Sequence, residues 1–221
     1  MRSLTAPTDQ QIITFSREFA ASAGKVFAAH TRGALMARWT GPHGAVVEID
    51  QFAARAGGKW RYTVSGGTGK YCFHGVFHEV TPDRRIVCTS ESVGRTSLEI
   101  RTFTDLGDGR SRVDGTSIFP SVTERDDAVR ETEQQADADY QRLDALLAAG
   151  LDEDAMPSIR YSGTTVDCAD PGALSTWGEP AGARRAGAGD RRRPVVVGQL
   201  QVAPLSLKPV GAAALPVWLA W

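Results

Sequence analysis

Three short stretches decide the fold of this chain: RWTGP at residues 38–42, GGKWRY at residues 57–62 and GVFHEVTP at residues 75–82. In the first, an aromatic residue closes a helix, and Gly-Pro begins a loop. The second enters a strand through paired glycines, and the proline of the third sets the end of a strand. Together they predict a curved sheet wrapped on a helix, with space between the two.

The elements before the second stretch are one strand and two short helices. Alternation with period two predicts a half-buried strand over residues 13–19, with Arg17 on its apolar face. Apolar residues then recur at helical spacing over residues 22–30, where Ser22 is a suitable N-cap. A second short helix is predicted over residues 34–38.

The rest of the domain is predicted to be a run of strands followed by one helix. Turn residues (Gly, Pro and Asp) separate six closely spaced strands, which indicates antiparallel pairing: 46–53, 59–64, 71–80, 86–91, 96–104 and 112–119. Ser121 and Glu124 match a capping box, and apolar residues keep helical spacing over residues 129–147, up to Gly150. This pattern predicts a long C-terminal amphipathic helix and an α+β fold of the helix-grip type, with two short helices after the first strand.

The composition changes near Gly150. Beyond it the chain is rich in Gly, Ala, Pro and Arg and shows neither helical nor strand periodicity. The sequence therefore predicts a flexible N-terminus at residues 1–10, one folded domain at residues 11–150, and a low-complexity, disordered tail at residues 151–221.

The folded region resembles the SRPBCC (START-like) superfamily and, within it, the proteins similar to the Activator of Hsp90 ATPase homologue. The residues that carry the resemblance are Phe19, Val26-Phe27, Arg38-Trp39, Gly41-Pro42, Asp50, Gly57 to Arg61, Gly75, Glu79-Val80, Pro82, Arg142-Leu143 and Leu146-Leu147. The resemblance spans residues 12–149 and implies a START/Bet v 1-like helix-grip domain. Two departures concern the pocket: Thr40 stands where the family often has a second tryptophan, and residues 136–140 lack the usual Gly-Trp.

Charge and cysteine usage exclude several classes of partner. Lys and Arg number 25 and Asp and Glu 26, a net charge of −1, so no global field favours nucleic acid or an anionic membrane. The apolar C-terminal stretch, residues 210–221, is interrupted by a proline and is too short to span a bilayer. Cys72, Cys88 and Cys168 fit neither a disulfide framework nor a zinc site. We therefore expect a cytoplasmic protein with no nucleic-acid or membrane partner.

A sheet that curls around a helix leaves a pocket unless bulky side chains fill it, and such pockets suit small apolar ligands. Residues expected on the inner face of the sheet or on the helix are candidates for ligand binding: Trp60, Tyr62, Tyr71, Phe73, Val129 and Tyr140. Ordinary core packing is the alternative for each of them, because aromatic residues dominate protein cores for reasons of area alone. His78 is a further candidate, as a polar group at the pocket or its rim, and surface exposure or a structural ion pair is the favoured alternative for it.

No motif for catalysis, a metal or a cofactor accompanies these residues. On one strand His74 and His78 would lie about 13 Å apart, too far to chelate one metal ion. The SGGTGK segment at residues 65–70 lacks the first glycine, the Ser or Thr after the lysine and the following helix of a phosphate-binding loop, which favours a hairpin turn. The sequence therefore predicts neither a metal nor a cofactor.

The function expected from the sequence is non-catalytic binding of a small hydrophobic or amphipathic ligand between the sheet and the C-terminal helix. The resemblance implies two alternatives: an enzyme similar to polyketide cyclases and aromatases, or an Hsp90 co-chaperone that activates its ATPase. The co-chaperone ranks last, because the chain shows no counterpart of the activator's separate N-terminal domain. The sequence leaves open whether the protein forms a homodimer.

Overall fold

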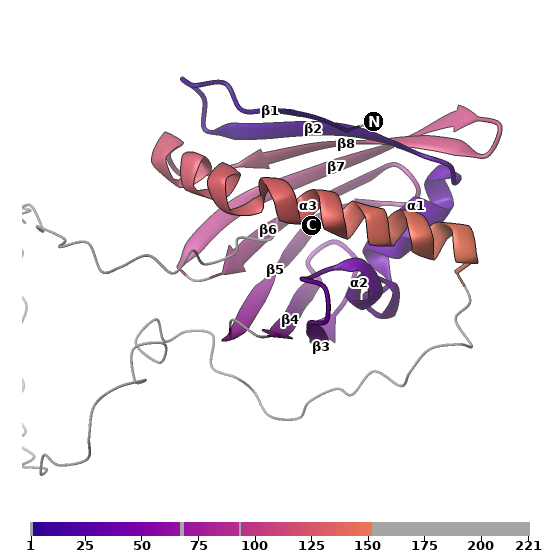
Figure 1. Ribbon diagram of the computed structural model, residues 1–221, viewed down its shortest axis with the longest axis horizontal. Helices are drawn as coiled ribbons and strands as arrows, with labels where there is room; N and C mark the ends of the chain where they lie inside the picture. The colour runs from indigo at the N-terminus through magenta and orange to yellow at the C-terminus, as the bar shows by residue number, and fades with distance from the viewer. Residues whose placement is uncertain (1, 67–68, 93, 152–221) are drawn as a thin grey trace, which may run out of the picture.

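The computed structural model of the protein describes residues 2–66, 69–92 and 94–151. One antiparallel sheet of eight strands has the order β1-β2-β8-β7-β6-β5-β4-β3. Helix α3 (Val122–Ala149) crosses one face of this curved sheet, with α1 (Ala23–Thr31) and α2 (Gly33–Trp39) beside its C-terminal half (Figure 1). The α+β helix-grip prediction is confirmed. The predicted tail lies outside the described residues, apart from Leu151.

The six predicted strands of the meander are present at the expected places. They are β3 (Val46–Phe52), β4 (Lys59–Gly66), β5 (Gly69–Thr81), β6 (Arg85–Ser92), β7 (Arg95–Gly107) and β8 (Arg110–Ile118). The first predicted strand is β2 (Ile12–Phe19), which pairs with β8 along its whole length. Because β2 pairs with β8, the first strand of the domain lies beside the last strand of the meander, and β3 lies at the opposite edge of the sheet.

One strand was missed. Within the N-terminal segment predicted to be flexible, Arg2–Thr5 forms β1, which pairs antiparallel with β2. Four residues are too few to show a periodic pattern, so the pairing partner determines this strand. The buried Arg125 side chain of α3 strengthens the arrangement, because its guanidinium donates hydrogen bonds to the carbonyl oxygens of Pro7 and Thr8.

The helix ends agree in part with their predicted caps. The Ser121 hydroxyl accepts a hydrogen bond from the Glu124 backbone N–H at 3.1 Å, which confirms the capping interaction at the start of α3. Gly150, with φ of 85°, ends this helix in a conformation that glycine adopts readily. Ser22 does occupy the N-cap of α1, but its side chain makes no capping bond there.

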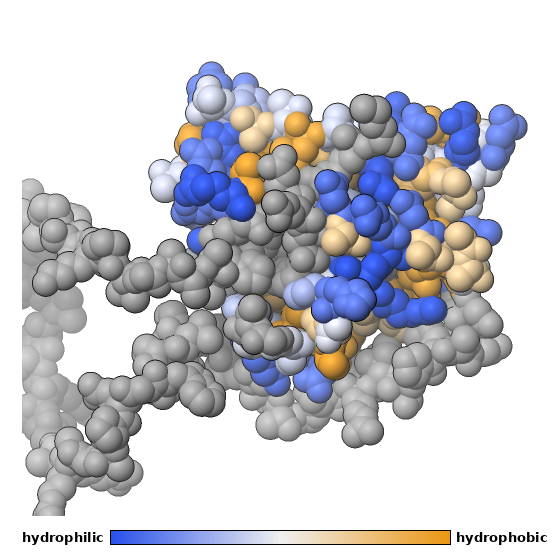
Figure 2. Space-filling model, viewed as in Figure 1, coloured by the Kyte–Doolittle hydropathy of each residue, from blue (hydrophilic) through white to orange (hydrophobic). Residues whose placement is uncertain are grey.

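Helix α3 is held to the rest of the domain at its C-terminal half. Arg142 donates hydrogen bonds to the carbonyl oxygens of Trp39, at 3.2 Å, and Gly41, and it forms an ion pair with the fully buried Asp139. Hydrophilic residues mark much of the described outer surface of this helix (Figure 2), whereas Leu143 is completely buried on its inner side. The amphipathic pattern in the sequence is thus used to cover the sheet.

Candidate ligand-binding site

Five of the seven residues predicted to bind a ligand lie together in the main core. Trp60 and Tyr62 of β4 stack with ring centroids 5.6 Å apart, and Tyr62 stacks on Phe73 of β5 at 5.2 Å. Tyr71 and Tyr140 belong to the same buried cluster, Tyr71 from β5 and Tyr140 from α3. The sheet and the helix therefore contribute aromatic rings to one shared interior, as the sequence predicted.

The remaining two predicted residues lie elsewhere. His78 is exposed on β5, because the preceding Phe77 is fully buried and successive side chains of a strand point to opposite faces. Val129 packs near the N-terminal end of α3 against a smaller cluster that contains Ile13 and Phe119. The structure does not bring either side chain to the aromatic interior, and the role of the seven residues in binding stays a prediction.

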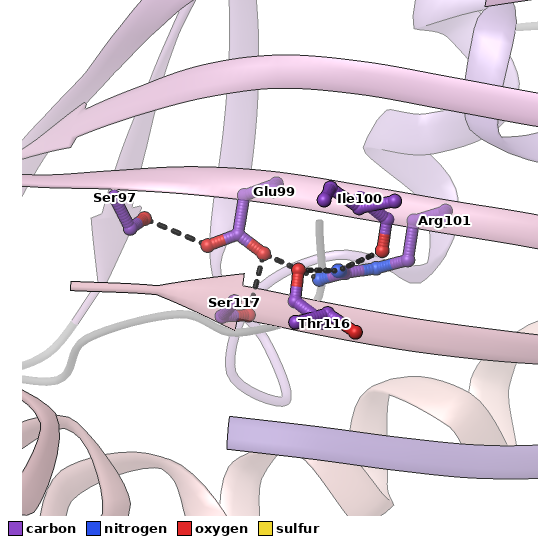
Figure 3. A network of polar contacts seen from close by, with 6 residues as sticks. All are labelled: Ser97, Glu99, Ile100, Arg101, Thr116 and Ser117. Atoms are coloured by element: carbon purple, nitrogen blue, oxygen red, sulfur yellow. Dashed lines mark hydrogen bonds and ion pairs between the residues drawn. The ribbon is translucent and has the colours of Figure 1, made fainter. Parts of the chain in front are cut away.

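A buried ion pair on β7 is the main polar feature of this interior. The Arg101 guanidinium donates to the Glu99 carboxylate at 2.8 Å, and the two side chains are only 2% and 4% exposed (Figure 3). Ser97 and Ser117 donate to the same carboxylate at 2.7 and 2.6 Å. Arg101 also donates to the carbonyl oxygen of Ile100 at 3.0 Å. Several hydrogen bonds thus compensate for the removal of both charges from water.

Sequence reasoning missed this pair. In β7 the apolar residues Leu98 and Ile100 alternate with Glu99 and Arg101, so alternation alone assigns the apolar pair to the core. The structure has the opposite orientation: Glu99 and Arg101 are buried, and Leu98 and Ile100 are only partly buried. The sequence did contain one indication of this orientation: Phe103 follows Arg101 by two residues, so it lies on the same face of β7 as Glu99 and Arg101, and it is also buried.

Arg101 is connected to helix α3 through aromatic rings. Its guanidinium carbon lies 4.9 Å from the centre of the Phe15 ring, and Phe15 contacts Tyr140 of α3 at 5.5 Å. Phe15 can lie flat here because its cross-strand partner is Gly115, where a Cβ atom would come within 2.0 Å of the ring. The small residue on β8 therefore makes room for a cation–π contact in the interior.

Burial and nearby carboxylates raise the pKa values of two side chains in this interior. Cys88 lies opposite Glu99 in the β6–β7 register, and burial together with the Glu99 carboxylate raises the pKa of its thiol. Burial and, next, the charge of Asp139 raise the pKa of Tyr62. Both groups are therefore neutral at pH 7, and Cys88 is not an activated nucleophile.

His30 of α1 is the one histidine in this interior, with 1% of its surface exposed. Its ring lies 4.9 Å from Trp39 and 5.3 Å from Phe103. The pKa of His30 is lowered to about 4, mainly by burial; the hydrogen bond to the Val26 carbonyl opposes this shift, and the charge of Arg101 adds to it. The imidazole is therefore neutral at pH 7.

Lowering the pH should destabilise the folded protein through His30. Above pH 6.5, the ordinary pKa, the ring is neutral in the folded and unfolded states and contributes no pH dependence. As the pH falls towards 4, only the unfolded state binds the proton, so the free energy of unfolding should drop by about 2 kcal/mol between pH 7.5 and 5. Urea unfolding at both pH values measures this. The drop should shrink in His30→Phe and persist in His78→Gln, and an equal drop in His30→Phe would contradict the assignment.

A surface hollow of about 590 Å³ adjoins the interior on the side of α1. It is lined by Ala23 and Gly24 at the start of α1, by the β5–β6 turn at Pro82 to Arg84, and by β7. Phe103 is one of its lining residues and also contacts His30. Phe103 is therefore shared between the wall of the hollow and the surroundings of the buried His30.

Two findings bear on other kinds of site. Within residues 2–66, 69–92 and 94–151, no three His, Cys, Asp or Glu side chains lie close enough together to hold a metal ion. None of the helices in the same part of the chain is long and apolar enough to cross a bilayer.

Comparisons with known proteins agree with the fold. The family model described as Activator of Hsp90 ATPase homolog 1-like protein matches residues 20–148, more than half of the chain. Ms6760 from Mycobacterium smegmatis has a similar structure, with 19% identity, a TM-score of 0.59, and coverage of 66% of this chain and 97% of that one. A protein from Rhodobacter sphaeroides has 21% identity, a TM-score of 0.61, and coverage of 67% and 99%.

A third similar structure, from Arthrobacter aurescens, has 18% identity and a TM-score of 0.60, and the match covers 66% of this chain and 91% of that one. No curated protein matches the sequence. These structural likenesses show the fold alone, whereas the family model matches the sequence itself over α1 to α3. The chain belongs to the family of Activator of Hsp90 ATPase homolog 1-like proteins.

Proposed function

We propose that the domain binds a small hydrophobic or amphipathic molecule in the interior between the sheet and α3. The observation that carries the proposal is the combination of aromatic walls with buried polar groups in one place. Trp60, Tyr62 and Phe73 supply stacked apolar surface. Arg101, paired with Glu99, supplies charge at the Phe15 ring, which in turn contacts Tyr140 of the helix. A binding site with mostly apolar walls and a few fixed polar groups has this composition.

A stability role alone is a weak explanation for such a pair. Buried ion pairs are often no more stabilising than well-packed apolar residues of the same volume. The pair does keep oriented hydrogen-bonding groups inside an apolar environment, where they act strongly on a bound molecule. This supports selection among ligands by polar contacts, with affinity supplied by the aromatic surface.

Native mass spectrometry on protein purified from its own host tests the proposal. We expect a complex heavier than the chain by one small molecule, which is released on denaturation. Phe73→Trp adds bulk to the interior and should abolish or reduce the bound species, whereas His78→Gln, on the exposed face of β5, should leave it unchanged. Wild-type protein that carries no molecule and binds none of a panel of hydrophobic and amphipathic compounds would contradict the proposal.

A second candidate is an enzyme similar to polyketide cyclases and aromatases. It is favoured by His30, a neutral imidazole at pH 7 within the same interior, which could accept a proton from a bound molecule. In that case the host ligand should be chemically converted during incubation, and His30→Phe should lose turnover while it still binds. A co-chaperone role, the third candidate, requires that the protein raise the ATPase rate of Hsp90; we expect no change.

A further inference from the structure

One cysteine of the sheet is covalently bonded. The spacing of the three cysteines did not predict a disulfide, yet Cys72 of β5 is disulfide-bonded. Cys88 of β6 is free and buried, so it is not the partner. The chain has one further cysteine, Cys168, which lies outside the described residues. Within a single chain, Cys168 is therefore the one cysteine that can complete the bond.

The Cys72 side chain lies on the face of the sheet opposite α3, which we call the outer face. Its neighbours Tyr71 and Phe73 are buried in the aromatic interior, and successive side chains of a strand point to opposite faces. The three described helices lie on the inner side (Figure 1), and Cys72 itself is half-buried. The disulfide is therefore made on the outer face, away from the candidate ligand-binding site.

An apolar row crosses the outer face near Cys72. It begins at Val76, whose backbone N–H donates a hydrogen bond to the Thr89 hydroxyl of β6 at 3.2 Å. Thr89 is opposite Leu98 of β7, which in turn is opposite Ile118 of β8. All four side chains are only partly buried. None of the described helices covers this row, because they lie on the other side of the sheet.

The chain beyond α3 is long enough to reach Cys72. Helix α3 ends at Ala149, and the described part of the chain ends at Leu151. An extended chain from Leu151 to Cys168 spans about 58 Å. This exceeds the length of α3 itself, which is about 42 Å. The segment can therefore pass from the inner side around an edge of the sheet to the outer face.

We propose that the Cys72–Cys168 disulfide is a redox-sensitive tether that holds the segment around Cys168 against the apolar row of the outer face. Glutathione disulfide is the oxidant. One cysteine thiolate attacks it and releases a first glutathione, and the second cysteine attacks the mixed disulfide and releases another. The two cysteine sulfurs are oxidised, and the two glutathione molecules take up the electrons and protons. Excess reduced glutathione reverses the exchange and frees the segment. This inference goes beyond the proposed function and does not depend on it.

Thiol counting on the full chain tests the bond. Wild-type protein is equilibrated with glutathione disulfide, denatured, alkylated with iodoacetamide and analysed by mass spectrometry. We expect alkylation of Cys88 alone, and of all three cysteines after reduction with dithiothreitol. A tryptic digest of the unreduced protein should contain one peptide pair that joins Cys72 to Cys168, and Cys88→Ser should keep it. Absence of this pair, or a pair that links two copies of the chain, would overturn the proposal.

A redox titration tests the contact with the apolar row. Docking of the segment raises the effective concentration of Cys168 at Cys72, so weaker docking makes the bond easier to reduce. In Leu98→Gln, the glutathione ratio [GSH]²/[GSSG] that opens half of the bonds should fall about tenfold, as expected for the loss of one apolar contact. Glu18→Gln, an exposed position at the far end of β2, should leave this ratio unchanged.

The outcomes separate the bond from the docking. If the peptide pair is present and Leu98→Gln titrates like the wild type, the segment does not lie on the apolar row and the docking is wrong. Should Leu98→Gln fail to fold, as judged by circular dichroism, Val76→Thr takes its place, because it replaces one methyl group of the same row by a hydroxyl. A Val76→Thr ratio equal to that of the wild type would contradict the docking in the same way.

Discussion

Glu99→Ala should lower the free energy of unfolding by about 3–5 kcal/mol, because it leaves the Arg101 charge buried without its carboxylate partner. Both side chains are almost completely buried, so water cannot replace the lost ion pair. Ser97 and Ser117 also lose the acceptor to which they donate. Urea unfolding followed by tryptophan fluorescence measures the change, since Trp39 and Trp60 lie in the same core.

The double replacement Glu99→Leu with Arg101→Met distinguishes lost pairing from lost packing. It removes both charges and keeps side-chain volume, so its stability should return to within about 2 kcal/mol of the wild type or exceed it. The matched control is Glu79→Ala, which breaks a pair with Arg85 at 3.4 Å in which both side chains are about half exposed. That change should cost less than about 1 kcal/mol. If Glu99→Ala lowers the free energy of unfolding no more than Glu79→Ala does, the Glu99–Arg101 pair is not desolvated.

Gly75→Ala should cost about 3 kcal/mol or more, through overpacking at a contact between strands. A Cβ atom at position 75 would lie 1.9 Å from the carbonyl oxygen of Thr89 on β6 and 2.8 Å from the ring of Trp60. The first clash is with backbone and cannot be relieved by a rotamer change. Relief requires β5 to move away from β6 or Trp60 to leave the core, and thermal unfolding would show either as a large decrease in Tm.

Gly24→Ala is the control for that substitution. Gly24 lies in α1, and an added methyl would meet only the carboxylate of Asp83, at 3.4–3.5 Å. Because alanine favours helix over glycine, this change should leave stability unchanged or raise it by up to about 1 kcal/mol. If Gly24→Ala and Gly75→Ala lower the stability equally, the close approach of Trp60 and β6 to Gly75 is not a feature of the folded protein.

Local sequence patterns were sufficient for most of the fold. Strands, helices and the start of α3 follow from alternation, helical spacing and the Ser121–Glu124 capping pattern, because these depend on neighbours along the chain. β1 was missed, since four residues carry too little pattern and the strand depends on β2 for its partners. For the candidate site, sequence spacing placed Trp60, Tyr62, Tyr71, Phe73 and Tyr140 in the interior, whereas Val129 packs against a second cluster and His78 is exposed.

The sequence by itself determined that a curved antiparallel sheet would be covered by a long amphipathic helix, since hydrophobic periodicity fixes which residues can share a face. It could not determine which face of β7 points inward, because both faces carry residues able to be buried. Tertiary structure decided this: on the inner face, Ser117 of the adjacent strand β8 donates a hydrogen bond to Glu99, and Phe15 of β2, the next strand along, makes a cation–π contact with Arg101. The same packing brings His30 of α1 to Phe103 of β7, far apart in the chain. The polar chemistry of the interior is therefore a property of the assembled sheet and helices.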